Sequence, residues 1–396
     1  MLGAIYTGLS GMNAFSQGLQ TISDNVTNLN TLGYKASTTT FSDLYSQGGG
    51  GLSYTDSGTE SAGSGVRFNT PKIDFSDGQL QQTGGDLDLA IQGSGFLVLK
   101  DGSDTLFTRT GQFSVGDDGY ITLNGTTHRL SVLDSGGQPE AVNVDAKRTR
   151  QPTATTKVVF ADNLSSTATT ATVSNIKVFD ANGGQHTWQA TLTTVGSSSP
   201  GQWTVAVTDE TSASVGSGTI SFLGGAPDPA HATVTISTTP ANAPALSVLL
   251  DFSQGVTAFS SGTTSSLWVG SSDGEGVGNL TSVTVDQSGK IQLTYSNGST
   301  DTAGSVALAD FRDPQELVRI GSGLFQDKGH GPMRYVASAA DGVGTLVSKQ
   351  LEGSNVNLSQ EFGDLILIQR GFQASSQVVS VANDMLQQLF GIRGQV

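Results

Sequence analysis

Closely spaced carboxylates are the side chains of this sequence that most resemble a catalytic pair. Asp86 with Asp88, and Asp117 with Asp118, each place two acidic groups near one another, and paired carboxylates act as acid and base in glycoside hydrolysis. Both pairs lie beside glycines, where Asp is common because its side chain bonds to the backbone of a turn. We interpret both pairs as turn residues, and a secreted β-rich carbohydrate-active enzyme stays open as an alternative.

The sequence offers no other catalytic, metal or cofactor constellation. The four histidines lie far apart in the sequence, outside the spacing with which His residues of one helix or hairpin share a metal. Cysteine is absent, which excludes thiolate ligands and Cys nucleophiles. The stretch GEGVGN at 274–279 lacks the full dinucleotide fingerprint and reads as a loop. We expect no catalytic residues, no metal and no cofactor.

Charge and hydropathy exclude further classes of function. The formal net charge of −15 over 396 residues argues against a nucleic-acid-binding surface and against binding to anionic membranes. No run of 18 apolar residues is present, so no membrane insertion is expected. The start of the chain lacks the basic and apolar regions of a Sec signal. If the protein is exported, we expect another route without a cleaved signal peptide.

Heptad patterns at the two ends of the chain predict a terminal helical domain. Residues 1–30 and 358–396 each carry apolar side chains every seven residues, with a second set three residues later, as in a coiled coil. Gly8 is the weak position of the first stripe. Each helix alone also fits an ordinary amphipathic helix on a globular core, but together they predict pairing with each other, with copies of themselves, or both. The predicted interface residues are Ile5, Met12, Phe15, Leu19, Ile22, Val26, Leu29, Leu365, Ile368, Phe372, Val379, Leu386 and Leu389.

The middle of the chain predicts two antiparallel β domains, the second inserted in the first. Short apolar runs alternate with Gly, Asp and Asn turns, a pattern typical of sandwiches and barrels. A basic, Pro-containing stretch at 145–157 and a Gly/Ser stretch at 253–278 indicate the two junctions. We predict a first β domain at 71–145 and 276–329, an inserted β domain at 146–275, and a linker or extended arm at 31–70 and 330–357.

The end of the first predicted helix carries a polar motif. NVTNLNTLGYK at 25–35 combines Asn and Thr, which bond free backbone groups at a helix end, with a glycine suited to a left-handed turn. The motif resembles the one that closes the first helix of the bacterial flagellar rod and hook axial proteins, with Thr27 in place of a usual Ala. Its matching residues are Asn25, Asn28, Thr31, Gly33, Tyr34 and Lys35.

Three further blocks support the same resemblance. LDLAIQGSGFLVL at 87–99 and FTRTGQFSVGDDGYI at 107–121 are similar to the first β-domain blocks of that family. The C-terminal LEGSNVNLSQ and QRGFQ stretches are similar to its C-terminal signature, with Asn357 in place of a usual Asp. The matching residues of the second stretch are Gln369, Arg370 and Gln373.

The resemblance implies a structural, non-enzymatic protein. Within the family, the length and the insertion are similar to hook subunits, which assemble into a flexible curved tube that passes torque from rod to filament. The implied partners are copies of the same chain, the distal rod protein, the hook cap protein, the hook–filament junction protein and the flagellar type III export apparatus. The implied location is the extracellular hook. A distal rod protein with an insertion stays open as the alternative within the family.

Overall fold

The chain divides into two compact units. The computed structural model describes residues 2–44, 65–196, 199–240, 243–329, 331–332, 334–340 and 342–393. One unit comprises Met1–Asp145, Thr284–Gln292 and Thr302–Val396, and the other comprises Ala146–Val283 and Leu293–Asp301. Much of the predicted flexible arm, residues 45–64, lies outside the described residues.

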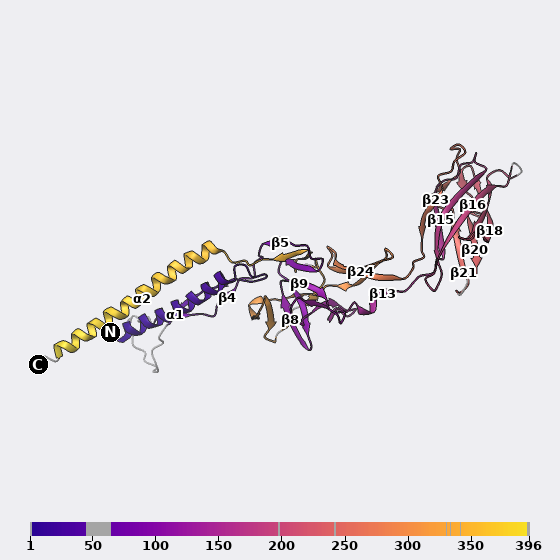
Figure 1. Ribbon diagram of the computed structural model, residues 1–396. Coiled ribbons are helices and arrows are strands. Elements are labelled where there is room, and N and C mark those ends of the chain that lie inside the picture. Colours follow the sequence, from indigo (N-terminus) through magenta and orange to yellow (C-terminus); the bar gives the residue numbers. More distant parts are fainter. Residues whose placement is uncertain are drawn as a thin grey trace, which may run out of the picture. The chain divides into compact units, whose positions relative to one another are not determined.

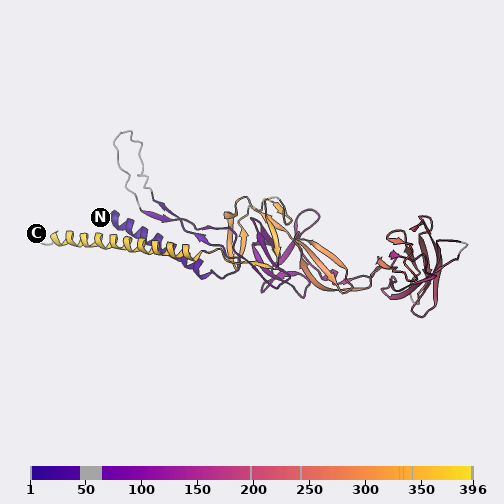
Figure 2. The ribbon, with the colours of Figure 1, turned by 90° about the horizontal axis from the view of Figure 1, so that it is seen from above.

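The two terminal segments form long helices that pack on each other. Helix α1 covers Leu2–Thr27 and helix α2 covers Leu358–Arg393. Figures 1 and 2 show them side by side and antiparallel, with the start of α1 and the end of α2 at the same end of the pair. The Oδ1 atom of Asn357 accepts hydrogen bonds from the amides of Ser359 and Gln360, so Asn357 caps the positive end of α2 as an Asp would. The predicted terminal helices are confirmed.

The first unit is built on one large, mainly antiparallel sheet. Its main path runs β28-β29-β8-β7-β11-β10-β9-β6-β31, and three more strands pair beside that path. Phe96, Val98, Phe107 and Phe325 belong to the apolar core of this sheet. Its strands are β6 (Asp88–Gln92), β7 (Phe96–Asp101), β8 (Asp104–Thr108), β9 (Thr110–Val115), β10 (Ile121–Leu123), β11 (Arg129–Leu133), β12 (Pro139–Ala141), β27 (Leu308–Asp310), β28 (Leu317–Gly321), β29 (Leu324–Asp327), β30 (Arg334–Val336) and β31 (Thr345–Ser348).

Short strand pairs connect this sheet with the helices. The pairs are β1 (Ser37–Thr38) with β4 (Lys72–Ile73), β2 (Phe41–Asp43) with β3 (Val66–Phe68), and β5 (Leu80–Gln82) with β32 (Gln350–Glu352). The rings of Phe15 and Phe41 lie 5.5 Å apart between centroids, and those of Phe41 and Phe68 lie 5.9 Å apart. The β2–β3 ribbon therefore packs against α1 through aromatic side chains.

The prediction of a linker at 330–357 is wrong for most of that range. Strand β30 pairs with β27, β31 pairs with β6, and β32 pairs with β5. Val343, Leu346 and Leu351 are buried. The strands are only three or four residues long, so their apolar positions are too few to show a period of two.

The second unit contains a β sandwich with its own core. One sheet runs β15-β16-β17-β18-β19, and the other runs β20-β21-β14-β22 with β23 paired to β14. The buried cluster includes Trp188, Trp203 and the stacked rings of Phe160 and Phe252. The strands are β14 (Lys157–Asn163), β15 (Thr170–Phe179), β16 (Gln185–Thr194), β17 (Gln202–Thr208), β18 (Ser214–Leu223), β19 (Ala226–Pro227), β20 (Thr233–Thr238), β21 (Leu246–Asp251), β22 (Val256–Thr257) and β23 (Trp268–Ser272).

Two details of the inserted β domain differ from the prediction. Strand β14 pairs in parallel with β21 and with β22, so the domain is not purely antiparallel. Parallel pairing needs a long crossover, which the segment between β14 and β21 supplies. The second unit also extends past 275 to Val283 and includes Leu293–Asp301. Its boundaries pass through a four-stranded sheet of β13 (Thr149–Arg150), β24 (Gly278–Val285), β25 (Lys290–Tyr295) and β26 (Thr300–Ser305).

The inserted β domain is expected to fold without the rest of the chain. All residues of its buried cluster and the side chains packed on it lie between 154 and 269. A fragment of residues 146–277 should therefore unfold cooperatively on heating, as small single domains do, when followed by circular dichroism. A gradual, non-cooperative trace would contradict an independent core.

Candidate functional site: the terminal helix pair and its junction

Glycines let the two helices approach closely. A Cβ atom placed on Gly8 would lie 2.7 Å from Cγ2 of Val379, and one on Gly371 would lie 2.4 Å from Cζ of Phe15. Such distances are shorter than real carbon contacts, so a side chain of the partner helix fills the space that each glycine leaves. Gly8 is therefore a point of close packing, and its interpretation as the weak position of the stripe is wrong.

A larger side chain at Gly8 is expected to separate the helices. Gly8→Leu places atoms where Val379 and the Ser375 carbonyl already lie, and overpacking of this kind costs about 1–3 kcal/mol. The helical signal at 222 nm should melt at a lower temperature than in the natural chain. Gly3→Leu is the matched control, because nothing lies within 4 Å of a Cβ at Gly3 and leucine favours helix over glycine. Equal melting of both variants would contradict the close packing.

The predicted interface stripes are only partly used inside the chain. Ile22 and Ile368 are buried, while Phe372 is 42% exposed. A single helix partner thus leaves much of the apolar surface open. The half-buried stripe residues are Ile5, Met12, Phe15, Val26, Leu29, Leu365, Val379 and Leu386, and the other exposed ones are Leu19 and Leu389.

Each helix also carries a second apolar row, which is exposed in α2 and exposed or half-buried in α1, and we call this row the outward seam. Neighbouring residues of this row are again spaced by three, four or seven positions, as in a heptad. Each helix therefore has two apolar rows at different heptad positions. In α2 the exposed fractions of Leu367, Val381 and Met385 are 69%, 55% and 54%. The outward seam of α1 comprises Ile5, Leu9, Met12, Leu19 and Val26, and that of α2 comprises Leu367, Ala374, Val378, Val381 and Met385.

The outward seam of α2 was missed because only one stripe was sought in each helix. Its signal is present in the sequence, since Leu367, Ala374 and Val381 recur every seven residues, and Val378 and Met385 do so as well. A helix that is apolar on more than one side is usually buried on more than one side. None of the helices in the described part of the chain is long and apolar enough to cross a membrane.

Asn25 ties the end of α1 to the start of α2. Its Nδ2 atom donates to the Ser37 carbonyl (2.9 Å) and to Oε1 of Glu361 (2.8 Å). Its Oδ1 atom accepts from the hydroxyl of Tyr34 (3.2 Å) and from the amide of Ser37 (2.9 Å). The buried amide therefore uses all four of its hydrogen-bonding positions. Burial raises the pKa of Glu361, and the bond from Asn25 opposes that rise.

The remaining polar residues of the motif close the helix end and turn the chain. Nδ2 of Asn28 donates to the Asp24 carbonyl (2.8 Å), and the hydroxyl of Thr31 donates to Oδ1 of Asn28 (3.0 Å). The Asp24 carbonyl in the last helical turn thus accepts from both the amide and the side chain of Asn28. Gly33 has a φ of 65°, and a Cβ there would lie 2.8 Å from Cγ2 of Thr110. Both conditions require glycine.

Tyr34 and Lys35 attach the segment that follows α1 to the sheet region of the first unit. The guanidinium of Arg319 lies 4.5 Å from the centre of the Tyr34 ring and donates to the Lys35 carbonyl. The Nζ atom of Lys35 lies 2.7 Å from Oε1 of Glu352 and 2.7 Å from the Ser76 carbonyl. Both Lys35 and Glu352 have fully buried side chains. Burial lowers the pKa of Lys35, and Glu352 opposes this.

A second buried cation completes this junction. Nη1 of Arg109 donates to the Gly95 carbonyl (2.8 Å), and Nη2 pairs with Asp77. Nε of Arg109 lies 3.5 Å from Oε2 of Glu352, which is ion-pair distance without a hydrogen bond. Of the predicted motif residues, Asn25, Asn28, Thr31, Gly33, Tyr34 and Lys35 meet here, whereas Gln369, Arg370 and Gln373 are exposed along α2.

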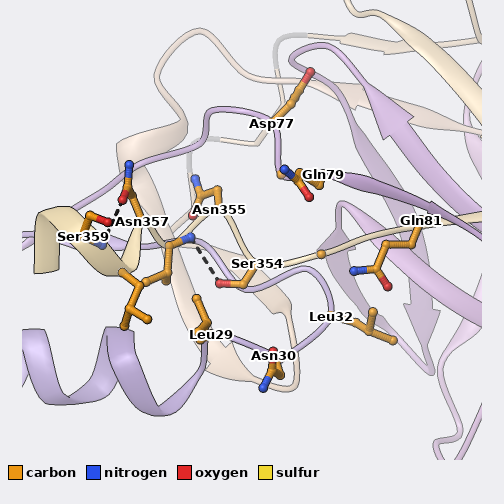
Figure 3. A pocket seen from close by; sticks show the side chains of 14 residues that line it. Leu29, Asn30, Leu32, Asp77, Gln79, Gln81, Ser354, Asn355, Asn357 and Ser359 are labelled. Atoms are coloured by element: carbon orange, nitrogen blue, oxygen red, sulfur yellow. Dashed lines mark hydrogen bonds between the residues drawn. The ribbon is translucent and has the colours of Figure 1, made fainter.

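A groove of about 710 Å³ lies beside the junction. Figure 3 shows the lining residues Leu29 and Asn30, which follow the end of α1, and Asn357 and Ser359, at the start of α2. The groove is lined mostly by amides, hydroxyls and glycines, and Asp77 is the acidic residue among its lining residues. Such a lining lacks the paired groups that acid–base chemistry needs.

The acidic pairs considered as catalysts are engaged elsewhere. Asp86 pairs with Lys349 at 2.9 Å, and Asp118 pairs with Arg129 at 3.0 Å and accepts from the Tyr120 amide. The bond from the Tyr120 amide is a turn contact of the kind that the Gly-rich context predicts, whereas the two ion pairs were not predicted. Among the described residues, no three His, Asp or Glu side chains are placed to hold a metal ion.

Comparisons with known proteins agree with this geometry. The family described as "Flagella basal body rod protein" matches residues 5–35, and "Flagellar basal body rod FlgEFG protein C-terminal" matches residues 347–392. These two ranges contain most of α1 and α2 and the junction residues Asn25, Lys35 and Glu352.

Relatives match along almost the whole chain. The flagellar hook protein FlgE of Treponema pallidum is 29% identical, with 99% of this chain and 100% of the relative covered. The flagellar basal-body rod protein FlgG of Bacillus subtilis is 25% identical at 99% and 100% coverage. The crystal structure of the Helicobacter pylori flagellar hook protein FlgE2 has a TM-score of 0.48 at 14% identity and covers 69% of this chain and 100% of that one. Along almost its whole length the chain is similar to flagellar hook proteins named FlgE, and both of its ends match families of flagellar rod and hook proteins.

Proposed function

We propose that the chain is a structural subunit of the bacterial flagellar hook that assembles with copies of itself into a tube. The observation that carries this proposal is the pair of outward seams on the terminal helices. Leu9 on α1 and Leu367 on α2 are both more than half exposed, although each belongs to a heptad row. Surface of this kind is rarely left in water and marks a contact with another protein.

The seams favour further helices as the occupant. A heptad row of small and medium apolar residues fits the knobs-into-holes packing of another helix, and the chain itself supplies two such helices. We propose that the outward seam of α1 in one copy packs against that of α2 in the next. Each copy then offers one donor and one acceptor surface, and such head-to-tail contacts produce open helical polymers.

The remaining properties follow from this role. The two β units have separate cores, so each can act as a rigid body while the tube bends and passes torque from rod to filament. We propose the hook as the location, reached through the flagellar type III apparatus without a cleaved signal peptide. The proposed partners are the distal rod protein, the hook cap protein and the hook–filament junction protein. Neither the groove nor the acidic pairs suggest an enzymatic role.

Electron microscopy of the assembled protein tests the proposal. The purified chain should form tubes above a critical concentration, and these tubes should be curved. A chain that stays monomeric at every concentration and salt condition tried would contradict the self-assembly that the seams support.

A distal rod subunit with an inserted domain is the second candidate. The observation that favours it is the match over 99% of this chain to a relative named as a basal-body rod protein. A rod must be straight and stiff, whereas a hook must bend. Straight, rigid tubes in the same images would therefore favour the rod.

A further inference from the structure

One residue, Glu352, contacts three separate segments of the chain at the junction. Its amide donates to the Thr110 hydroxyl (3.0 Å), and its carbonyl accepts from the Gly33 amide (2.8 Å). Its Oε1 atom accepts from Lys35 and from the Gly78 amide, both at 2.7 Å. The backbone and the carboxylate of this residue thus hold three different parts of the first unit, at residues 33–35, 78 and 110.

The same residue balances the buried charge. Lys35 and Arg109 are two cations with fully buried side chains, and Glu352 is the fully buried anion between them. The fourth charge is Asp77, whose side chain is 41% exposed. Without the Glu352 carboxylate, two buried cations would share one anion at the surface, and breaking a buried ion pair from one side is strongly destabilising.

The order of the residues in the chain determines which of these charges is synthesised first. Lys35 precedes Glu352 by 317 residues, and a chain is made from its N-terminus. The segment after α1 therefore holds its cation long before the balancing anion exists. An isolated helix such as α1, with several glycines, is marginal in water.

We propose that Glu352 is the closing residue of the junction: its arrival neutralises Lys35 and Arg109, locks residues 33–35 onto the β unit, and so positions α1 and its apolar seam only once the chain is nearly complete. This inference rests on the proposed function, because it concerns when the assembly surface is formed. It assigns Glu352 a positioning role, at a distance from the seams themselves. An incomplete chain would lack an ordered α1 surface and would not enter a polymer.

Trypsin digestion of the full chain tests the closure directly. Lys35 is a trypsin site whose side chain is fully buried when the junction is closed. Glu352→Gln keeps the shape but removes the charge, and we expect release of residues 1–35 to be at least about tenfold faster, as measured by mass spectrometry. Glu275→Gln is the matched control. It also removes the charge of a glutamate in an ion pair, since Glu275 pairs with Arg150 at 3.1 Å, but both residues belong to the second unit. Equal release from Glu352→Gln and the natural chain would overturn the proposal.

A double variant that restores the charge balance tests whether Glu352 acts through its charge or only through its shape. Lys35→Met with Glu352→Gln leaves Arg109 and Asp77 as a neutral pair. Hydrogen exchange of the Gly33 amide, which bonds the Glu352 carbonyl, should be fast in Glu352→Gln and slow again in the double variant. Fast exchange in both would overturn the proposal. If Glu352→Gln does not fold at all, the double variant decides: slow exchange at Gly33 supports closure by charge balance and fast exchange overturns it.

Both measurements use monomer below the concentration at which any polymer forms. A chain that never polymerises would contradict the proposed function and leave these readouts unaffected. A chain that polymerises but shows no effect of Glu352 on Lys35 or Gly33 would overturn the closing role alone.

Discussion

A chain that ends at Asp364 is expected to stay folded and monomeric and to lose polymerisation completely. The cut removes the part of α2 that packs on the glycines of α1 and the whole outward seam of α2. It keeps Glu352 and Glu361, so the junction retains its charge balance and its bond to Asn25. Light scattering and sedimentation should show monomer at concentrations where the full chain forms tubes.

The β units are expected to be unaffected by this truncation. The buried clusters around Trp188 and around Phe96, as far as the structure describes them, contain no residue from either helix, so the melting temperature of the β domains by circular dichroism should match that of the full chain. The helical signal should fall by more than the removed residues account for, because α1 loses its partner and is marginal alone. Polymer formation by the shortened chain would show that the helices are not the assembly surface. Loss of the β-unit transition would show that the helices are part of one cooperative core.

The terminal helices could be predicted because each is long enough to repeat its apolar pattern several times. Both terminal helices contain several heptads, and recognisable signals mark the end of α1, at the polar motif 25–35, and the start of α2, at the cap residue Asn357. The strands at 330–357 were missed because three or four residues carry too little alternation, and their burial comes from partners such as β6 and β5 that are distant in sequence. The parallel pairing of β14 with β21 is likewise a contact between distant segments that no local pattern specifies.

The candidate site could be predicted only in part, because many of its contacts also join segments that are distant in sequence. The resemblance pointed to Asn25 and Lys35, but their partners Glu361 and Glu352 lie more than 300 residues away and belong to no local pattern with them. Gly8 was predicted to be a weak position because the effect of a glycine depends on what faces it, and only the structure places Val379 against Gly8. The outward seam of α2 was available from the sequence, and a search for two stripes per helix would have found it.

The outward seam itself is expected to be the most sensitive surface of the chain. Met385 is the last residue of the outward seam of α2 and is 54% exposed. Met385→Glu places a carboxylate where we propose that a neighbouring copy packs. Burying an unpaired charge and losing the methionine contacts together cost about 3 kcal/mol or more. Since each 1.4 kcal/mol changes an equilibrium about tenfold, the critical concentration for tube formation should rise about a hundredfold.

Gln387→Glu is the matched control for this substitution. Gln387 is exposed on the same helix and two residues further along, and each residue turns an α-helix by about 100°, so its side chain points away from the seam. The added charge is the same, and general repulsion between subunits that each carry −15 should affect both variants equally. We expect Gln387→Glu to form tubes at nearly the natural concentration and both variants to keep the melting temperature of the monomer. Equal impairment of the two variants would attribute the effect to net charge. A lower melting temperature for Met385→Glu alone would place Met385 in a contact within its own chain, and the seam would then lose its role as the surface that joins one copy to the next.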